Sequence, residues 1–262
     1  MSSVPGRAQV TRPAPALRSI AALAALELRL TARRGENVLV TLVIPVAVLL
    51  FFANTSLVPG TREQVVDYLL PGSIALAIIA SGLVSLGIAT GYERSYGVLK
   101  RLGGAPLPRW GLLAAKLAAV LVLVAAQVVL LVAVAWFALD WRPEPGWSPG
   151  LFATAIVLGT VTFVALGLLL AGTLRAEMTL ALANLLFLAF LTLGGIILPL
   201  DQLPSFLEPI AATLPATALG DLLRAALAPA GLDAATVWAP SVILGAWALA
   251  ASVLAARWFR WD

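Results

Sequence analysis

The most polar stretch of this chain of 262 residues is YERSYGVLKRLGGAPLPRW, which occupies residues 92–110 between two long apolar runs. Its charged side chains are Glu93, Arg94, Lys100, Arg101 and Arg109. The chain has no Cys and no His, which excludes thiolate nucleophiles, histidine proton transfer and zinc sites of the usual ligand types. Little is left for bond-breaking chemistry, so we interpret this stretch as a place that orients the chain or contacts a partner.

The elements that position this stretch are apolar. Hydrophobic residues make up 61% of the sequence and charged residues 11%, which is more apolar surface than a water-soluble domain of this size can bury. Because lipid offers no hydrogen bonds to the backbone, long uncharged runs are expected to be helical. The sequence therefore predicts an all-α integral membrane protein with six transmembrane helices. Their expected positions are 37–58, 68–91, 110–139, 150–173, 178–198 and 237–257.

Residues 16–34 are helix-prone but too charged to span a membrane. Arg18, Arg29 and Arg33 fall opposite a broad apolar arc, which is the pattern of an amphipathic helix at the membrane interface. Glu27 is the exception, because it falls within the apolar arc. Residues 1–15 contain Pro and Arg without periodicity, and we expect a disordered cytoplasmic tail there.

The distribution of Lys and Arg predicts the orientation. With both termini in the cytoplasm, all of the 17 Lys and Arg residues except Arg62, Arg142 and Arg224 lie on the inner side. Residues 92–110 then form the largest cytoplasmic loop. The long segment 199–236 is external, and its five prolines among apolar residues predict short helices lying at the surface.

The first part of the cytoplasmic loop, residues 95–104, can form two helical turns. The apolar face of this short helix consists of Val98, Leu99 and Leu102. A loop that only reverses the chain has no need of such a face, so the pattern favours docking on a partner. For Arg94, Arg109 and Lys116 the alternative is that they only enforce orientation, and Lys116 can extend its ammonium back to the headgroups.

Two stretches resemble permease subunits of ABC-2 type exporters, a family that includes bacterial drug and antibiotic efflux systems. The first, YERSYGVLKRLGGAPLPRWGLLAAKLAAVLVLVAAQ, is similar to the family's region from the end of span two to span three. Its matching residues are Glu93, Arg94, Gly97, Leu99 to Leu102, Pro106 to Pro108 and Lys116. The second, GGIILPLDQLPSFLEPIAATLPATALGDLLRAAL, is similar to the end of span five and the external re-entrant helices. Tyr96 and the Gly103-Gly104 pair depart from the family's more charged pattern.

The resemblance implies an elbow helix at 16–34, a coupling helix at 95–104, an external re-entrant region at 199–236 and a separate ATPase. The residues that it assigns to coupling with the ATPase are Glu93, Arg94, Gly97, Val98, Leu99, Lys100, Arg101 and Leu102. A smaller second contact is expected near Arg175 and Glu177. The chain has no G-x-x-x-x-G-K-[ST] run, so it is expected to bind no cofactor itself, with ATP and Mg²⁺ bound by the partner subunit. A second copy of this chain, or a related permease, completes the expected complex.

Glu27 on the elbow helix has a candidate role in this scheme. Its carboxylate can pair with Arg94, Lys100 or Arg101 and so connect movement of the elbow helix to the coupling helix. The alternative is a Glu27 side chain that is solvated or extended to the headgroups.

The candidate substrate path consists of Asn54, Ser81, Asn184, Phe187 and Thr192. None of these candidate path residues is ionisable, which argues against a proton or ion relay along the path. For small residues such as Ser81, helix packing is the alternative to cargo contact. The path residues on span five are expected to line the interface between two permeases, because the family places its path there.

These observations predict a multi-pass protein of the bacterial plasma membrane that is a transport subunit and not an enzyme. It would move an apolar or amphipathic compound outward, with energy from ATP hydrolysis in a partner. A drug or antibiotic is the first cargo class, and a lipid or lipid-linked glycan is the second. The rival hypothesis is an ATP-independent channel or membrane assembly protein, which predicts no associated ATPase.

Overall fold

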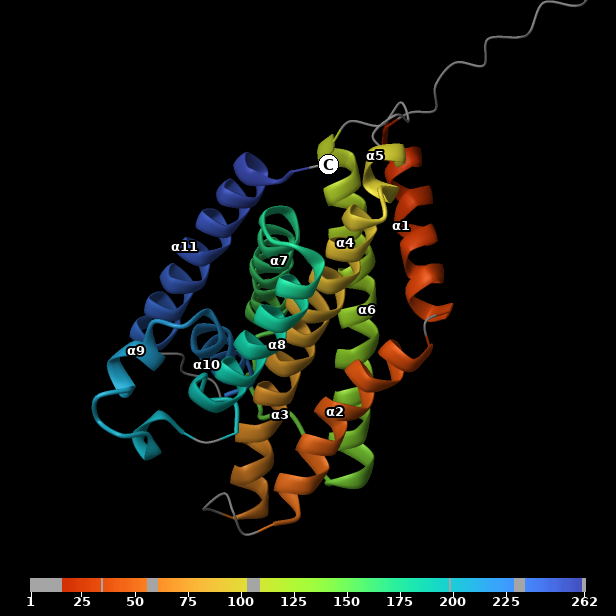
Figure 1. Cartoon of the computed structure of the whole chain (residues 1–262). Helices are drawn as coiled ribbons and strands as arrows, with labels where there is room; N and C mark the ends of the chain where they lie inside the picture. Colours follow the sequence, from red (N-terminus) through yellow and green to blue (C-terminus); the bar gives the residue numbers. More distant parts are fainter. Residues whose placement is uncertain are drawn as a thin grey trace, which may run out of the picture.

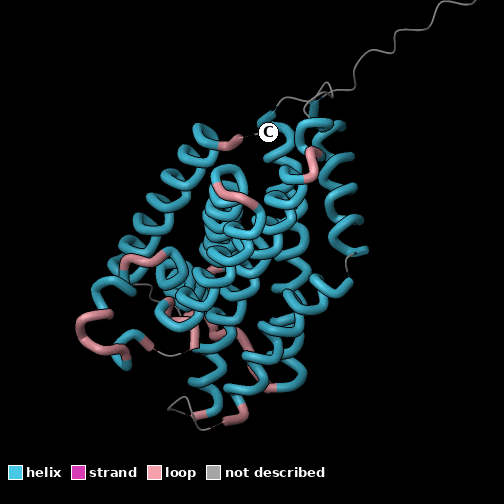
Figure 2. Tube along the Cα trace, in the orientation of Figure 1, coloured by secondary structure: helices cyan, strands magenta, loops and turns pink. Residues whose placement is uncertain are grey.

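The computed structural model describes residues 16–33, 35–55, 61–102, 109–197, 199–228 and 234–260. Within these ranges the chain is helical without strands, as Figures 1 and 2 show. The helices are α1 (Ala16–Arg33), α2 (Gly35–Ala53), α3 (Arg62–Ile79), the π-helix η1 (Ala80–Ser85), α4 (Leu86–Ser95), α5 (Val98–Leu102), α6 (Arg109–Ala138), α7 (Pro149–Thr173), α8 (Ala176–Leu193), the 3₁₀-helix η2 (Leu200–Gln202), α9 (Glu208–Ala212), α10 (Pro215–Leu227) and α11 (Ala234–Trp258). The predicted tail 1–15 lies outside the described residues.

In the described part of the chain, five helices are long and apolar enough to cross a membrane. They are Gln64–Ser95, Trp110–Ala138, Pro149–Thr173, Ala176–Leu193 and Thr236–Trp258. At the position of the predicted first span, α2 contributes the apolar segment Thr41–Ala53, and a turn follows at 54–55. The predicted end at residue 58 falls outside the described residues. The chain is therefore a multi-pass membrane protein, with five helices of spanning length among its described residues.

The helix at the fifth predicted span ends earlier than expected. Helix α8 stops at Leu193, whereas the sequence predicted a span to residue 198. Gly194 and Gly195 cause the stop, because Gly195 takes a φ of 62°, which side chains with a Cβ disfavour.

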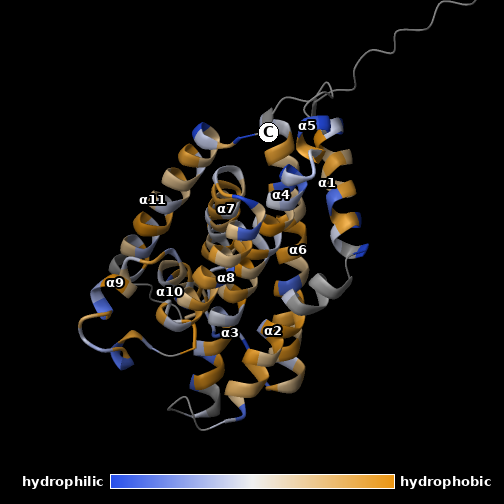
Figure 3. Cartoon of the chain, viewed as in Figure 1, coloured by the Kyte–Doolittle hydropathy of each residue, from blue (hydrophilic) through white to orange (hydrophobic). Residues whose placement is uncertain are grey.

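Exposed tryptophans lie at both ends of α11 and at the start of α6. Trp110 and Trp258 are exposed at the end that also holds α5, called here the α5 end, and Trp238 is exposed at the opposite end of α11 (Figure 1). The rise from Trp238 to Trp258 is about 30 Å at 1.5 Å per residue, which equals the hydrocarbon thickness of a bilayer. Tryptophan prefers the boundary between lipid and water. Figure 3 shows apolar residues dominating the helices between these ends.

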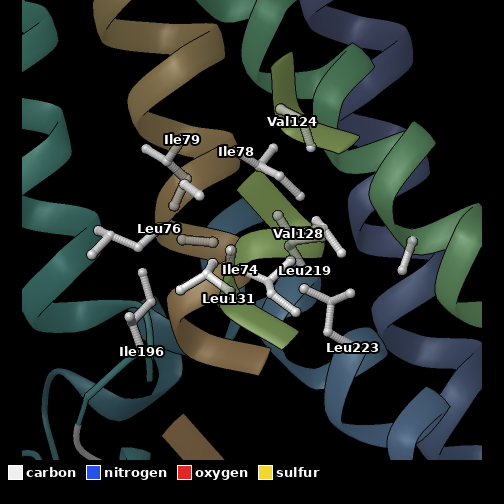
Figure 4. Close-up of a cluster of buried hydrophobic side chains, with 14 of the residues drawn as sticks. Ile74, Leu76, Ile78, Ile79, Val124, Val128, Leu131, Ile196, Leu219 and Leu223 are labelled. Carbon is white, nitrogen blue, oxygen red and sulfur yellow. The ribbon is translucent and has the colours of Figure 1, made fainter. Parts of the chain in front are cut away.

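The core of the bundle is built around the long second span, which runs through α3, η1 and α4. Its residues Ile74 and Ile78 have no exposed surface, and they lie among Leu131 of α6 and Leu219 and Leu223 of α10 (Figure 4). A helix buried on all sides has apolar or small residues all round, which is the composition of this segment. The second span is thus the central element to which the functional loop at its end is attached.

The prediction that segment 199–236 forms short helices at the surface was wrong for α10. Nine of its residues are buried: Pro215, Ala216, Thr217, Ala218, Leu219, Gly220, Leu222, Leu223 and Ala226. The helix packs against α3, α7 and α11, inside the bundle. Helix α10 has more apolar residues than a helix at the surface needs on one face. Proline determines that the helix starts at Pro215, but it does not determine whether the helix is buried.

Helix α7 approaches the second span so closely that only glycine fits. A Cβ at Gly167 would lie 2.4 Å from the carbonyl oxygen of Gly82 and 3.1 Å from that of Leu83. Gly87 lies against the same glycine, with an added Cβ 3.1 Å from the Gly167 Cα. The contact involves η1, where the π-helical turn shifts the register of the second span. Small residues thus allow the two backbones to touch.

At the end of the bundle opposite α5, the carbonyl of Gly195 receives two hydrogen bonds. The Tyr68 hydroxyl of α3 donates to it at 2.6 Å, and Arg224 Nη1 of α10 donates at 3.1 Å. The Arg224 guanidinium also lies over the Tyr68 ring and pairs with Asp221 at 2.7 Å. This contact fixes the chain after α8 to both α3 and α10.

We expect Tyr68→Phe to lower the free energy of unfolding by about 1 kcal/mol, because one of the two donors to the Gly195 carbonyl is lost. The measurement is the apparent thermal midpoint in detergent, compared with Tyr96→Phe, whose ring is 73% exposed. Equal midpoints for the two variants would show that the Tyr68 hydroxyl contributes nothing to this contact.

Candidate functional site

The predicted coupling segment is a tight turn followed by the short helix α5. Gly97 takes a φ of 70°, and its carbonyl accepts a hydrogen bond from the Arg101 amide at 3.2 Å. The Tyr96 amide donates to Tyr92 and the Gly97 amide to Arg94, both at 2.9 Å. Glycine is the residue best suited to this backbone conformation. The turn therefore attaches α5 firmly to the end of α4.

The exposed residues of this segment form a compact surface at the end of the bundle, called here the α5 surface. It consists of Tyr96, Val98, Lys100 and Arg101. Tyr96 is 73% exposed and its ring stacks on that of Tyr92, while Val98 is 38% exposed. An apolar centre flanked by two cations is suited to a protein partner with complementary acidic residues.

The predicted docking face was wrong in including Leu99. Its side chain has no exposed surface, so it packs within this chain and is not available to a partner. The physical reason is that a helix of five residues attached to the bundle turns one side inward, and Leu99 lies on that side. Leu102 ends α5, and its side chain lies outside the described residues.

Arg94 is engaged within the chain. Its Nη2 donates to the carbonyl of Leu174 just after α7, which joins the end of α4 to the connection between α7 and α8. The guanidinium sits at the negative end of the α7 dipole, which favours a cation there. Among the described residues, Nη1 of this guanidinium is buried and has no hydrogen-bond partner.

Behind the α5 surface, three charged side chains meet between helices. Lys116 Nζ of α6 lies 2.8 Å from Glu27 Oε1 of α1 and 2.7 Å from Glu93 Oε2 of α4. Lys116 is only 1% exposed, and the two carboxylate side chains are 14% and 15% exposed. We call Glu27, Glu93 and Lys116 the charged cluster. It connects the three helices near the α5 end.

The charged cluster corrects two predictions. Glu27 does pair with a cation, but its partner is Lys116 and not Arg94, Lys100 or Arg101. For Lys116, the alternative of an orientation signal that extends to the headgroups is wrong, because its ammonium points to two carboxylates inside the protein. The reason is that α1 packs along the first half of α6 (Figure 1) and contributes Glu27 as a partner of Lys116.

A cavity of about 40 Å³ adjoins the charged cluster between α1, the second span and α6. Along the second span it is lined by Ser81, Ser85, Ala89 and Glu93, which recur every four residues and so share one face. The volume is enough for ordered water and too small for a drug-sized molecule.

At the inner end of this cavity, Ser81 belongs to a buried hydrogen-bond network. Its hydroxyl donates to Gln127 Oε1 at 3.0 Å, and Gln127 Nε2 donates to the Thr41 carbonyl at 3.3 Å. These bonds connect η1, α6 and α2. The network supports the packing alternative for Ser81, because this residue is 1% exposed and its hydroxyl is already engaged.

Ser81→Ala tests the role of this network. The change leaves the buried Gln127 carbonyl oxygen without its donor, so we expect the free energy of unfolding to fall by about 1–2 kcal/mol. The apparent thermal midpoint should drop relative to Ser85→Ala, a partly buried serine one turn away. An unchanged midpoint together with altered cargo response would instead support a place for Ser81 in the substrate path.

The predicted path residues do not meet in one cavity among the described residues. Asn184 and Thr192 are exposed on α8, and each donates to a backbone carbonyl one turn earlier, at 2.9 Å. Phe187 on the same helix is partly buried. Asn54 is exposed after the end of α2 and donates to the Leu50 carbonyl at 2.8 Å. Four of the five candidates therefore lie at or near the outside of the chain, and Ser81 lies in its core.

The smaller predicted contact lies at the start of α8. Arg175 is the N-cap residue of that helix, and Glu177 is in its first turn, where a carboxylate favours the helix dipole. Both are exposed.

Lys116 is the residue that sequence reasoning misplaced. A signal was available, because a lysine within an otherwise uncharged helix normally faces a partner inside the protein. The sequence offered no way to identify Glu27 and Glu93 as its two partners, since they are distant in the chain.

Comparison with known proteins agrees with this arrangement. The family model for the ABC-2 type transporter matches residues 18–228, from α1 to the residue after α10. Over 198 residues the chain is 26% identical to "Putative transport permease YvfS" of Bacillus subtilis (strain 168), which covers 74% of this chain and 79% of that relative. The residues matched by the family model include the charged cluster and the α5 surface. This chain belongs to the ABC-2 type transporter family.

Proposed function

We propose that this chain is the permease subunit of an ATP-driven exporter and that its α5 surface docks on a separate ABC ATPase. The observation that carries the proposal is the combination of a rigid Gly97 turn with exposed Val98, Lys100 and Arg101 at one end of a membrane bundle. Family membership supports an ATPase partner. ATP and Mg²⁺ would bind to that partner and supply the energy through hydrolysis.

The proposed orientation puts the α5 end in the cytoplasm of a bacterium, with the chain in the plasma membrane. The positive-inside distribution supports this, because Lys100, Arg101 and Arg257 lie at the α5 end. In this orientation α2 acts as the first of six spans, α1 is the elbow helix, α5 is the coupling helix and α10 is part of an external re-entrant region. Both termini are cytoplasmic.

The proposed cargo is an apolar or amphipathic compound, with a drug or antibiotic as the first class to test. Helix α8 supports a path on its outward face, because Asn184 and Thr192 are exposed there beside the apolar Leu185 and Leu188. Two permeases facing one another through α8 would place these side chains around the cargo. Phe187 would add an aromatic surface.

The experiment is ATP hydrolysis by the chain reconstituted with the ABC ATPase encoded nearest to its gene. We expect hydrophobic and amphipathic compounds from a panel to stimulate hydrolysis severalfold, and sugars to have no effect. Stimulation by lipid-linked glycans alone would move the cargo assignment to the second class. A complete lack of ATPase association would contradict the proposal and favour an ATP-independent channel or assembly protein.

A further inference from the structure

The charged cluster has one cation for two carboxylates. Lys116 contacts Glu27 and Glu93 through one oxygen of each, at 2.8 and 2.7 Å, and is itself almost fully buried. A buried cation that loses its only partner is strongly disfavoured. With two carboxylates in reach, Lys116 keeps one partner when the other moves away. The cluster can therefore change its pairing without leaving an uncompensated lysine.

Room for such a change exists beside the cluster. The adjoining cavity of about 40 Å³ is lined by Glu27, Glu93 and Lys116 together with two serines. A water molecule needs only a small polar space with partners for hydrogen bonds. A carboxylate released from Lys116 can thus be hydrated in place.

Movement of α5 reaches the cluster through a short and rigid path. Glu93 lies in the last turn of α4, five residues before Val98. The hydrogen bonds of the Tyr96-Gly97 turn fix α5 to this last turn. Displacement of α5 by a partner therefore displaces Glu93, whereas Glu27 belongs to α1, which packs on α6 beside Lys116.

We propose that Lys116 is a positioning residue of the transport cycle. It holds α4 and α5 against α1 and α6 through Glu93, and it keeps Glu27 as its partner when α5 moves and Glu93 separates. The inference rests on the proposed function, because the ATPase is what moves α5. Lys116 touches no cargo in this account and acts through the position of Glu93.

The natural absence of cysteine makes a direct test practicable. Ala89→Cys places one thiol in the cavity lining, one turn from Glu93. The purified complex with the ATPase is labelled with a water-soluble sulfonated maleimide, without nucleotide and after trapping with ATP and vanadate. With native Lys116 we expect trapping to change the labelling rate at least fivefold, because the cavity hydrates when Glu93 separates.

Three variants in the Ala89→Cys background decide the role of Lys116. Lys116→Met should bring the ratio of trapped to untrapped labelling rates close to one, and Lys116→Arg should restore most of the change. The neutral triple variant Glu27→Gln, Glu93→Gln, Lys116→Met should also lose the change while folding normally, because it leaves no unpaired buried charge. Arg29→Met is the matched control, since it removes an exposed cation from the same helix as Glu27.

The outcomes separate the inference from the proposed function. A nucleotide effect that persists in the folded triple variant, or in Lys116→Met, overturns the role of Lys116 alone. An unchanged labelling rate in the chain with native Lys116, although the ATPase is bound, overturns this inference alone, whereas a lack of bound ATPase overturns the proposed function and this inference with it. Loss of the effect in Arg29→Met would show that the effect also requires an exposed cation outside the charged cluster and would overturn the specific assignment to Lys116.

Discussion

Replacing Gly167 by leucine should prevent α7 from packing against the second span. The added Cβ alone would lie 2.4 Å from the Gly82 carbonyl oxygen, a backbone atom that cannot rotate away. We expect the free energy of unfolding to fall by about 3 kcal/mol or more, which should lower the apparent thermal midpoint in detergent by roughly 10 °C. The yield of monodisperse protein should fall as well.

The matched control is Gly245→Leu in α11, where an added Cβ meets nothing within 4 Å. Both changes put leucine into a membrane-spanning helix, so only the packing differs. If Gly167→Leu were as stable as Gly245→Leu, the close approach of α7 to η1 would be incorrect.

The second large effect is expected from Val98→Asp on the α5 surface. A carboxylate at the apolar centre of a docking contact is desolvated without a designed partner, so the affinity for the ATPase should fall about 30-fold, equivalent to about 2 kcal/mol. The measurement is the amount of ATPase retained on purified permease at increasing dilution. Because Val98 is 38% exposed, the fold of the permease should be unaffected.

Phe206→Asp provides the control for Val98→Asp. Phe206 is 72% exposed and lies between α8 and α10, away from α5 (Figure 1). Its replacement changes an exposed apolar side chain into a carboxylate without touching the α5 surface. Leu99→Asp is unsuitable as a docking test, because Leu99 is fully buried and its change would disturb the fold of α5. Equal ATPase retention by Val98→Asp and native permease would exclude α5 as the docking element.

Much of the helical arrangement could be predicted from composition. Long uncharged runs leave the backbone no alternative to helix in lipid, so the helices from Gln64 to Trp258 occupy the predicted second to sixth spans. The end of α8 was harder to predict, because the sequence does not show that Gly195 takes a left-handed backbone conformation. The first span was predicted to run to residue 58, whereas α2 ends at Ala53 and a turn follows at the polar residues Asn54 and Thr55.

The burial of α10 and Leu99 could not be predicted for a different reason. Both lie in short segments whose apolar residues can face lipid, a partner or the core, and the choice depends on packing against distant helices. For α10 the core provides partners such as Ile74 and Leu131, and the helix packs there. A helix of five residues such as α5 has too little periodicity to show which side turns inward.

For the candidate site, the sequence identified Glu27 and Glu93 as notable but did not join them. Glu27 stood out because it interrupts an apolar arc, and Glu93 because it matches the family's Glu-Arg pair. Lys116 connects them only because α1 packs beside α6, and that is a tertiary contact without a local signal. The sequence thus showed where unusual charged residues lie in the chain, but it did not show which of them form pairs.

The most direct test of the central claim is ATP hydrolysis by the partner ATPase in lipid bilayers with and without this chain. The account predicts that native permease recruits the ATPase to proteoliposomes and that amphipathic compounds then stimulate hydrolysis, while Val98→Asp strongly weakens both effects. An ATPase that stays in solution, with the same activity in the presence and absence of native permease, would contradict the account.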